Sequence, residues 1–298
     1  AGAKVLIVER HHELGGGLIT DEWSGFRFNT HAKLMMMMDV APAYTDLELE
    51  SWGCTYRRPD AAATILTRDG RALTLYSDIA RTAQSIARSS TDDAQAYVVE
   101  EALIPATYSL PMPLLDMAVS YERSDVGRVV NEMAEESFVE TLEAAGFESE
   151  LLKAAILYIG TMYGMDPEGG LGFLLPLFYT RLLHASVISN GSHQLAGSLA
   201  RFANNNGVAV ERAATVTRIL CEGTKAVGVR LSGGEEVFAR SVITTTDPKM
   251  TFLEMVGEDV CNQAAPSLVD QTKSWEWEST SLLNAHYALD RRPVLAAA

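Results

Sequence analysis

A short apolar run near the start of the chain limits the possible folds more than any other feature. Val5 to Val8 is uninterrupted and apolar, three of its four residues are β-branched, and Glu9 follows directly. Such a run is typical of a parallel strand that is covered on both faces. In a dinucleotide-binding βαβ unit, the acidic residue after the second strand accepts hydrogen bonds from ribose hydroxyls. Glu9 has that position, so the sequence predicts half of a nucleotide site.

Three glycines, Gly15 to Gly17, follow this strand and allow the backbone to pass close to a bulky ligand. The phosphate-binding turn of such a unit lies about twenty residues before the acidic residue. Only eight residues precede Glu9. Two explanations are open: the first strand and its turn are missing from this chain, which we favour, or the chain binds no dinucleotide in the usual way.

Composition restricts the partners. With 298 residues and 47% hydrophobic content, the chain is long enough for one large or two ordinary domains. The formal net charge of -15 predicts repulsion from nucleic acids and anionic lipid surfaces, so we expect neither as a partner. No apolar stretch reaches the roughly eighteen residues of a membrane span. Three widely spaced cysteines favour reduced thiols in a cytoplasmic protein and provide no metal-binding spacing.

Periodicity predicts a change of architecture after the first forty residues. A short helix is expected over 46–52 and strands over 56–58, 62–67 and 72–76, the last two joined as a hairpin by an Asp69-Gly70 turn. Ser77-Asp78 is expected to cap the helix that follows. Helices dominate the prediction from 91 to 184, including an acidic amphipathic segment over 122–150 and apolar helices over 151–163 and 171–184. Hairpin strands followed by many helices indicate an α+β domain inserted into the nucleotide-binding one.

Patterns in the second half of the chain predict both helices and strands again. The expected elements are a helix over 192–206 with Gly207 beyond its end, a three-stranded meander over 214–238, and a β-branched strand over 241–245. A helix is expected from about 252 to 273, and a further strand over 281–289.

Several short motifs occur in an order that resembles a known family. They are Glu9-Arg10, Leu14-Gly15-Gly16, Thr20, Gly25 to Thr30, Asn190 to Leu195, Val216 to Ile219, Gly228 to Leu231 and Thr246 to Lys249. Together they resemble the phytoene desaturase-like flavoproteins, and most of all the phytoene dehydrogenase-related branch. The resemblance covers nearly the whole chain and is strongest over residues 1–40 and 186–253. It implies a Rossmann-like FAD-binding domain of the glutathione-reductase type, here incomplete, in an α/β protein.

The resemblance also implies which residues hold the cofactor. The expected FAD-binding residues are Glu9, Arg10, Gly15, Gly16, Gly17, Thr20, Gly191, Val216 and Asp247. In this family the helix start at Gly191 presents backbone amides, the backbone of Val216 approaches the adenine, and Asp247 faces the flavin. For Asp247 a simple helix N-cap is an equally good interpretation.

Catalytic candidates are few, because a flavin carries the chemistry in such enzymes and the protein supplies position and a dry cavity. His31 is the one catalytic residue we would test, although a structural histidine is the commoner outcome. Met35 to Met38 either line an adaptable apolar pocket or fill gaps in the core.

The resemblance predicts a domain division and a function. The FAD-binding domain is expected over 1–40 and 186–250, and the substrate domain over 41–185 and 251–298. The expected function is that of an FAD-dependent oxidoreductase, of desaturase or dehydrogenase type, which acts on an apolar carotenoid-like or lipid-like substrate and assembles as a homo-oligomer. Two alternatives are a redox-inactive module of the flavin family that serves as a binding or subunit interface, and a non-redox isomerase that uses reduced flavin.

Overall fold

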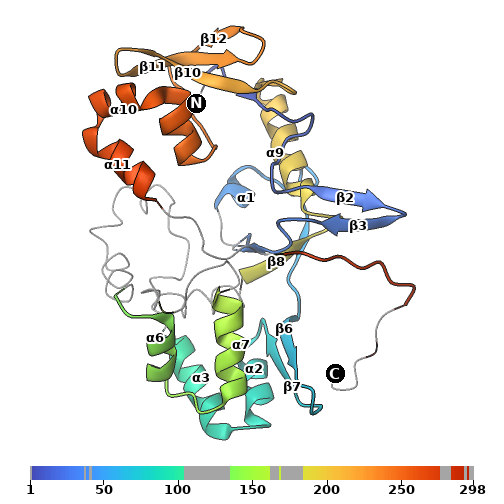
Figure 1. The fold of residues 1–298 in the computed structure, drawn as a ribbon. Coiled ribbons are helices and arrows are strands. Elements are labelled where there is room, and N and C mark those ends of the chain that lie inside the picture. Colours follow the sequence, from blue (N-terminus) through green and yellow to red (C-terminus); the bar gives the residue numbers. More distant parts are fainter. Residues whose placement is uncertain are drawn as a thin grey trace. The chain divides into compact units, whose positions relative to one another are not determined.

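The computed structural model describes residues 2–36, 38–39, 42–103, 135–161, 168, 184–275, 283–291 and 294. The chain divides into two compact units. Unit 1 comprises Ala1–Gly16 and Ala200–Trp277, and unit 2 comprises Gly17–Leu199 and Glu278–Ala298. Each unit combines helices and strands, as expected for an α/β protein (Figure 1).

Unit 1 begins with the strand that the sequence predicted. β1 (Leu6–Val8) pairs in parallel with β9 (Ala209–Glu211), with Leu6 opposite Ala209 and Val8 opposite Glu211. The parallel direction confirms the interpretation of this apolar run. Full coverage is not observed, because Leu6 is exposed and β9 is the one strand that pairs with β1 among the described residues.

The rest of unit 1 is a meander followed by helices (Figure 1). β10 (Val216–Glu222), β11 (Lys225–Leu231) and β12 (Glu236–Phe238) form the predicted antiparallel sheet, in the order β10-β11-β12. The backbone of β12 approaches Gly228 of β11 closely. A Cβ at position 228 would stand 2.3 Å from the carbonyl oxygen of Val237. A π-helix, η3 (Lys249–Gly257), and two α-helices, α10 (Glu258–Ala264) and α11 (Pro266–Ser274), confirm the helical prediction for this part.

Residues 241–245 form no strand, contrary to the prediction. No described strand pairs with them, and Ile243 is 92% exposed. The threonine hydroxyls hydrogen-bond locally instead, Thr244 with Thr246 at 2.7 Å and Thr246 with Thr251 at 2.7 Å. β-branched residues favour a strand where a neighbouring strand can pair with them, and the described residues supply none here.

Unit 2 contains two hairpins and a small antiparallel sheet. β2 (Thr20–Trp23) pairs with β3 (Phe26–Asn29), and β6 (Ala61–Leu66) pairs with β7 (Ala72–Tyr76) across the predicted Asp69-Gly70 turn. β4 (Met35–Met36), β8 (Ala185–Ile188) and β5 (Tyr56–Arg57) form an antiparallel sheet with β8 in the centre. The strand predictions for 56–58, 62–67 and 72–76 are therefore confirmed.

The larger core of unit 2 lies between the β6–β7 hairpin and four helices. These are α2 (Ile79–Ala87), α3 (Thr91–Leu103), α6 (Phe138–Ala144) and α7 (Glu150–Thr161), which Figure 1 shows beside the hairpin. Leu75, Ile86, Phe138 and Ile156 are almost fully buried there. Asp78 caps α2 by accepting the N–H of Arg81 at 2.8 Å, as predicted. Of the acidic segment, 122–134 lies outside the described residues, as do residues 171–183 of the helix predicted over 171–184.

Two predictions within unit 2 are wrong. α1 (Pro42–Asp46) ends where a helix over 46–52 was expected to begin. Proline favours the first helical position, and Glu48 has a positive φ of 50°, so the helix starts and stops earlier. Residues 283–289 form no strand. Helix α9 (His193–Asn205) begins in unit 2 and ends in unit 1, and its bounds are close to the predicted ones.

Candidate functional site

The Glu9 carboxylate lies at the carboxyl end of β1. The Glu9 N–H donates to the carbonyl of Glu211 at 2.9 Å, which continues the parallel ladder by one residue. Its side chain is half-buried, and Oε1 accepts the N–H of His11 at 2.8 Å. Among the described residues the second carboxylate oxygen has no protein donor, and it is not among the buried atoms. A strand-end carboxylate with one accessible oxygen fits the hydroxyl groups of a ribose.

The chain after Glu9 is fixed against the segment that leads into β10. Ala214 donates its N–H to the carbonyl of Glu9 and Ala213 donates to that of His11, each at 3.0 Å. Val216, at the start of β10, is two residues farther on. The fold of unit 1 thus gathers two predicted cofactor positions, Glu9 and Val216, although they are far apart in the sequence.

The predicted glycines have the backbone freedom expected of them. Gly15 and Gly16 adopt φ values of 128° and 53°, which side chains rarely allow. No atom lies within 4 Å of a Cβ placed on Gly16, so the space beside it is open. A Cβ placed on Gly17, which belongs to unit 2, would lie 3.8 Å from Cβ of His31. Arg10 is exposed, and its Nε lies 3.2 Å from Nε2 of His11.

Thr20 and Gly191 meet at the amino end of α9. The side-chain oxygens of Thr20 and Asn29 accept the N–H groups of His193 and Ser192, each at 3.1 Å. A Cβ on Gly191 would stand 2.6 Å from Oγ1 of Thr20, so the position requires glycine. Two of the backbone amides that we expected to face a cofactor are therefore engaged within the protein. Asn29 completes this network, and apart from the family motif no local pattern singled it out.

Asp247 acts as a helix cap. Its Oδ1 accepts the N–H of Met250 at 3.1 Å, and its carbonyl accepts the N–H of Thr251 at 2.8 Å, at the start of η3. These contacts match the N-cap interpretation. A role of Asp247 beside a flavin stays a prediction.

His31 has few contacts. Its ring is exposed, and Nδ1 lies 3.2 Å from the hydroxyl of the adjacent Thr30. No carboxylate among the described residues orients this imidazole, so no described contact supports a catalytic role for it. Met38, from the methionine run, is buried with Leu49, Cys54 and Ile188, and therefore fills the core.

Sequence reasoning missed a polar cluster at one end of the β4-β8-β5 sheet. Oδ2 of Asp39 lies 2.7 Å from Nη2 of Arg58 and 2.9 Å from Nδ1 of His184. These three residues, called here the Asp39 cluster, follow β4, follow β5 and precede β8 respectively. Because β8 runs antiparallel to both of its neighbours, all three side chains meet at the same end of the sheet. No local motif could reveal this, since the residues come from three distant segments.

Two tyrosines, Tyr44 and Tyr56, pack against each other with ring centroids 5.1 Å apart, and Tyr56 precedes Arg58 of the Asp39 cluster by two residues. Burial raises the pKa of Tyr44 to about 12, and its hydroxyl donates to the carbonyl of Cys54 at 2.7 Å. The pKa of Tyr56 is also raised, first by burial and then by the negative charge of Asp39, while Arg58 opposes the shift. Both phenols are therefore neutral at physiological pH.

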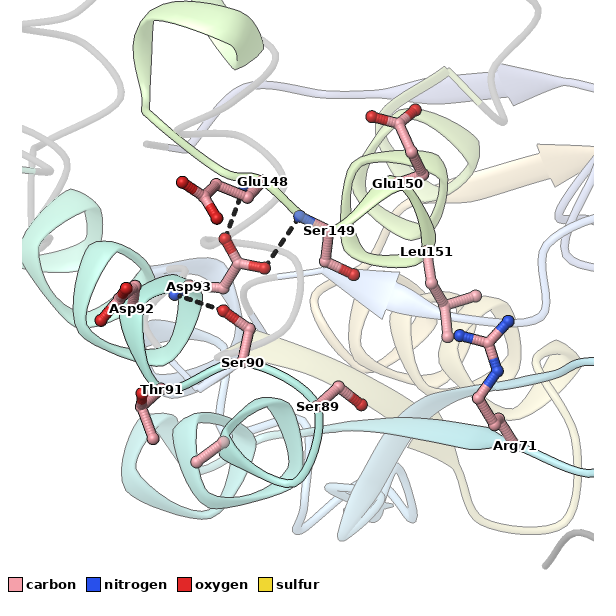
Figure 2. A pocket seen from close by; sticks show the side chains of 11 residues that line it. Arg71, Ser89, Ser90, Thr91, Asp92, Asp93, Glu148, Ser149, Glu150 and Leu151 are labelled. Atoms are coloured by element: carbon pink, nitrogen blue, oxygen red, sulfur yellow. Dashed lines mark hydrogen bonds between the residues drawn. The ribbon is translucent and has the colours of Figure 1, made fainter.

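A hollow of about 680 Å³ lies elsewhere in unit 2, between the starts of α3 and α7 (Figure 2). Asp92, Asp93, Glu148 and Glu150 line it, and Arg71 is the one basic residue among the described residues of its wall. The excess of carboxylates in its wall repels the phosphates of a nucleotide. The carboxylate of Asp93 is fully buried and accepts the N–H groups of Glu148 at 2.6 Å and Ser149 at 2.9 Å.

Metal and disulfide chemistry find no support in the described residues. Within the described ranges there is no group of three or more His, Cys, Asp or Glu residues that could hold a metal ion. Cys54, Cys221 and Cys261 are thiols, not halves of disulfides. No helix in the part of the chain that the structure describes is long and apolar enough to cross a membrane.

Comparison with known proteins identifies the family. The model of the flavin containing amine oxidoreductase family matches residues 1–297. The chain belongs to this family. The predicted relationship to flavoproteins is thus confirmed, and so is a flavin as the cofactor class of the family.

Individual relatives agree with this assignment. One of the subunits of the limonene dehydrogenase of Castellaniella defragrans is 40% identical over 98% of this chain and 56% of its own length. Hydroxyneurosporene desaturase of Cereibacter sphaeroides is 30% identical over 38% of this chain and 23% of its own length. These names support the resemblance to the phytoene desaturase-like branch. The chain spans little more than half the length of the first of these relatives.

The fold is shared with solved structures of oxidoreductases. A structure of an oxidoreductase from Methanosarcina mazei superposes with a TM-score of 0.63 over 92% of this chain and 60% of its own, at 14% sequence identity. This likeness confirms the α/β fold class. The division into the predicted domains and the individual cofactor residues stay predictions.

Proposed function

We propose that the protein is an FAD-dependent oxidoreductase that dehydrogenates an apolar terpene-like or carotenoid-like substrate. The observation that carries the proposal is the accessible carboxylate oxygen of Glu9 at the end of a parallel strand, in a chain that belongs to a flavin-containing family. The names of the relatives, a limonene dehydrogenase and a hydroxyneurosporene desaturase, support the substrate class.

The residues of unit 1 fit the adenosine part of this cofactor. Glu9 would hold the ribose hydroxyls, and Gly15 and Gly16 would let the backbone approach the rest of the molecule without a clash. Val216, next to the segment that hydrogen-bonds the Glu9 carbonyl, is proposed to lie at the adenine. When bound, a flavin supplies the capacity to accept a hydride. The protein supplies binding, orientation and exclusion of water.

Flavin content tests the proposal directly. The purified protein is expected to show the visible absorbance of an oxidised flavin, either as isolated or after addition of FAD. A protein that stays colourless after the addition would contradict the proposal and favour the redox-inactive alternative. Bleaching of this absorbance by limonene or phytoene under anaerobic conditions would distinguish an oxidoreductase from an isomerase, which causes no net reduction.

Glu9→Ala tests the residue that carries the proposal. Loss of a charged acceptor for hydroxyl groups should weaken FAD binding about 10- to 100-fold, as the usual strength of such hydrogen bonds implies. Glu13→Ala is the matched control, because Glu13 is an exposed carboxylate on the same loop. Equal retention of FAD by both variants would remove Glu9 from the site.

We further propose that the protein works in the cytoplasm as part of an assembly of several chains. The limonene dehydrogenase relative is named as one of the subunits of its enzyme, which supports this. Sedimentation of the purified protein, alone and in cell extract, should give a mass above that of one chain. A single-chain mass in both samples would contradict the assembly.

A further inference from the structure

One extra residue interrupts the parallel pairing of β1 with the chain around β9. The Val5 carbonyl accepts the N–H of Ala209 at 3.0 Å. With the same spacing the Glu9 carbonyl would accept the N–H of Ala213, but it accepts that of Ala214 instead, at 3.0 Å. Ala213 is therefore the inserted residue of a β-bulge just after β9. Bulges end the pairing of two strands or redirect a side chain, and they are over-represented next to active sites.

The backbone conformation of Ala213 is unusual for an alanine. Its φ is 54°, in the left-handed region, where a Cβ is unfavourable and glycine or asparagine is usual. Alanine has no polar side chain that could hydrogen-bond locally and offset this cost. The side chain is exposed, so apolar packing does not force the conformation either. A strained residue of this kind persists where its backbone contacts hold it in place.

These backbone contacts lead to the Glu9 carboxylate. The left-handed residue turns the N–H groups of Ala213 and Ala214 toward the same opposing segment, where His11 and Glu9 provide the carbonyl acceptors. The N–H of His11 in turn donates to Oε1 of Glu9 at 2.8 Å. Ala213 thus holds His11 by its carbonyl, and His11 holds one oxygen of the carboxylate by its N–H. All of these residues belong to unit 1.

From this geometry we propose that Ala213 is a positioning residue for the adenosine ribose, and that it acts through His11 on the carboxylate of Glu9. The role rests on the proposed function, in which Glu9 binds the ribose hydroxyls of FAD. With Oε1 held by His11, the other carboxylate oxygen has a fixed direction. It then accepts a ribose hydroxyl without first losing side-chain freedom, which favours binding. Ala213 itself contacts no part of the ligand in this proposal.

The FAD affinity of variants at position 213 provides the first test. Ala213→Val places a β-branched residue at a positive φ, so the bulge should give way. FAD binding should then weaken about 10-fold, the effect of roughly one hydrogen bond to a charged group. Ala213→Gly and Ala213→Asn tolerate the conformation and should stay within about twofold of the wild type. Asparagine is no smaller than alanine or glycine, so an equal loss for Ala213→Val and Ala213→Asn would overturn the proposal in favour of an effect of size.

Ala239→Val is the matched control for the valine substitution. Ala239 is an exposed alanine of the same unit, and its φ is not positive. The change should leave FAD affinity within about twofold of the wild type. A loss at Ala239 as large as that at Ala213 would overturn the assignment, because the conformation of Ala213 would then not be its cause.

A double-variant cycle with Glu9→Ala separates a positioning role from a merely structural one. Glu9→Ala removes the carboxylate but keeps the backbone groups that bond Ala214 and Glu211. If Ala213 acts through the carboxylate, Ala213→Val should weaken FAD binding by less than about twofold once residue 9 is alanine. The full loss in both backgrounds would show that the bulge supports only the fold, and would overturn the proposal.

Amide hydrogen exchange provides a readout that needs no ligand. The N–H of His11 is bonded to Oε1 of Glu9, so its exchange should become faster in Ala213→Val and stay as slow as in the wild type in Ala213→Asn. Unchanged exchange at His11 in a folded Ala213→Val variant would overturn the proposed path. If urea unfolding shows that this variant does not fold, Ala213→Leu, which is not β-branched, takes its place, with the same order of effects expected.

The FAD measurements also separate this role from the proposed function. If the wild-type protein binds no FAD, the proposed function falls together with this role. If the wild type binds FAD, Glu9→Ala binds it weakly and folded Ala213→Val binds it as tightly as the wild type, this role alone is overturned.

Discussion

Two aspartates in unit 2 are both largely or fully buried, yet their surroundings differ in one decisive respect. Asp93 uses both carboxylate oxygens, one for the N–H of Glu148 and one for the N–H of Ser149. Asp39 directs two partners to Oδ2, while Oδ1 has none among the described residues. A fully satisfied buried carboxylate can join parts of a structure, whereas a buried oxygen without a hydrogen-bond partner lowers stability. Asp93 therefore links α3 to the segment before α7, whereas the charge of Asp39 is only partly satisfied within the described residues.

The largest expected effect is that of Asp93→Ala. The substitution removes the fully buried acceptor of the Glu148 and Ser149 N–H groups, just before α7, and should lower the free energy of unfolding of this region by about 3 kcal/mol. Urea unfolding, with amide hydrogen exchange to localise the loss to α7, measures it. Asp92→Ala changes an exposed neighbour and should cost less than about 0.5 kcal/mol. Equal effects of the two substitutions would remove Asp93 from its structural role.

Gly191→Ala should have the next largest effect on stability. Gly191 lies at the start of α9, where the side chains of Thr20 and Asn29 accept the backbone N–H groups of His193 and Ser192. The new Cβ would stand 2.6 Å from Oγ1 and 2.7 Å from Cγ2 of Thr20, at a φ of 111°. We expect a loss of about 2 kcal/mol in unfolding free energy from strain and crowding together. Gly207→Ala is the matched control, because its φ is also positive but no atom lies within 4 Å. It should lose only about 1 kcal/mol.

Combining Gly191→Ala with Thr20→Ala separates crowding from strain. Removal of the Thr20 hydroxyl and methyl eliminates the close contacts, so the double variant should lose less stability than the two single changes predict together. Strict additivity of the losses would show that backbone strain alone makes glycine necessary at this position.

Asp39→Asn should alter stability little, which sharpens the contrast with Asp93. Its ion pair involves a guanidinium that is 45% exposed, and such pairs contribute roughly 0–1 kcal/mol. The free energy of unfolding of unit 2, measured in urea, should therefore change by less than about 1 kcal/mol. A loss as large as that of Asp93→Ala would mean that the Asp39 cluster is structural.

The smallest effect is expected for Glu140, an exposed carboxylate that also accepts backbone N–H. The N–H of Ser137 donates to it at 2.9 Å and lowers the pKa of Glu140. Because the pKa is lowered on folding, this capping box stabilises the fold above the ordinary pKa of glutamate, and the contribution disappears as the pH falls through the lowered value. Glu140→Gln should flatten that part of the acid unfolding curve, whereas Glu136→Gln should leave it unchanged.

The sequence was informative where local patterns decide the structure. The apolar run before Glu9, the Asp69-Gly70 hairpin, the Asp78 cap and the β10–β12 meander were all predicted, because strand period, turn residues and caps act within a few positions. Residues 241–245 show the limit of such patterns. Their β-branched composition favours a strand, but a strand also needs a partner, and the sequence does not reveal which partner is in reach.

Part of the candidate site could be predicted from local sequence patterns and part could not. The strand-end carboxylate of Glu9 and the glycines after it follow from local spacing together with the family motif. The Asp39 cluster does not, since its members are close only after three distant segments pair into one sheet. His31 was selected because it lies near that motif, but no carboxylate among the described residues orients its ring.

The pairing of β1 with β9 has a consequence for the order of events during protein synthesis. The ribosome releases Leu6 long before Ala209, its partner in the parallel ladder. At about 5–20 residues per second, the first strand waits on the order of 10–40 s for that partner. Through this interval Val5 to Val8 is an unpaired apolar edge, the kind of segment that chaperones bind, while the intervening chain can already collapse. Formation of the parallel pair of β1 and β9 is thus a late event in the life of the nascent chain.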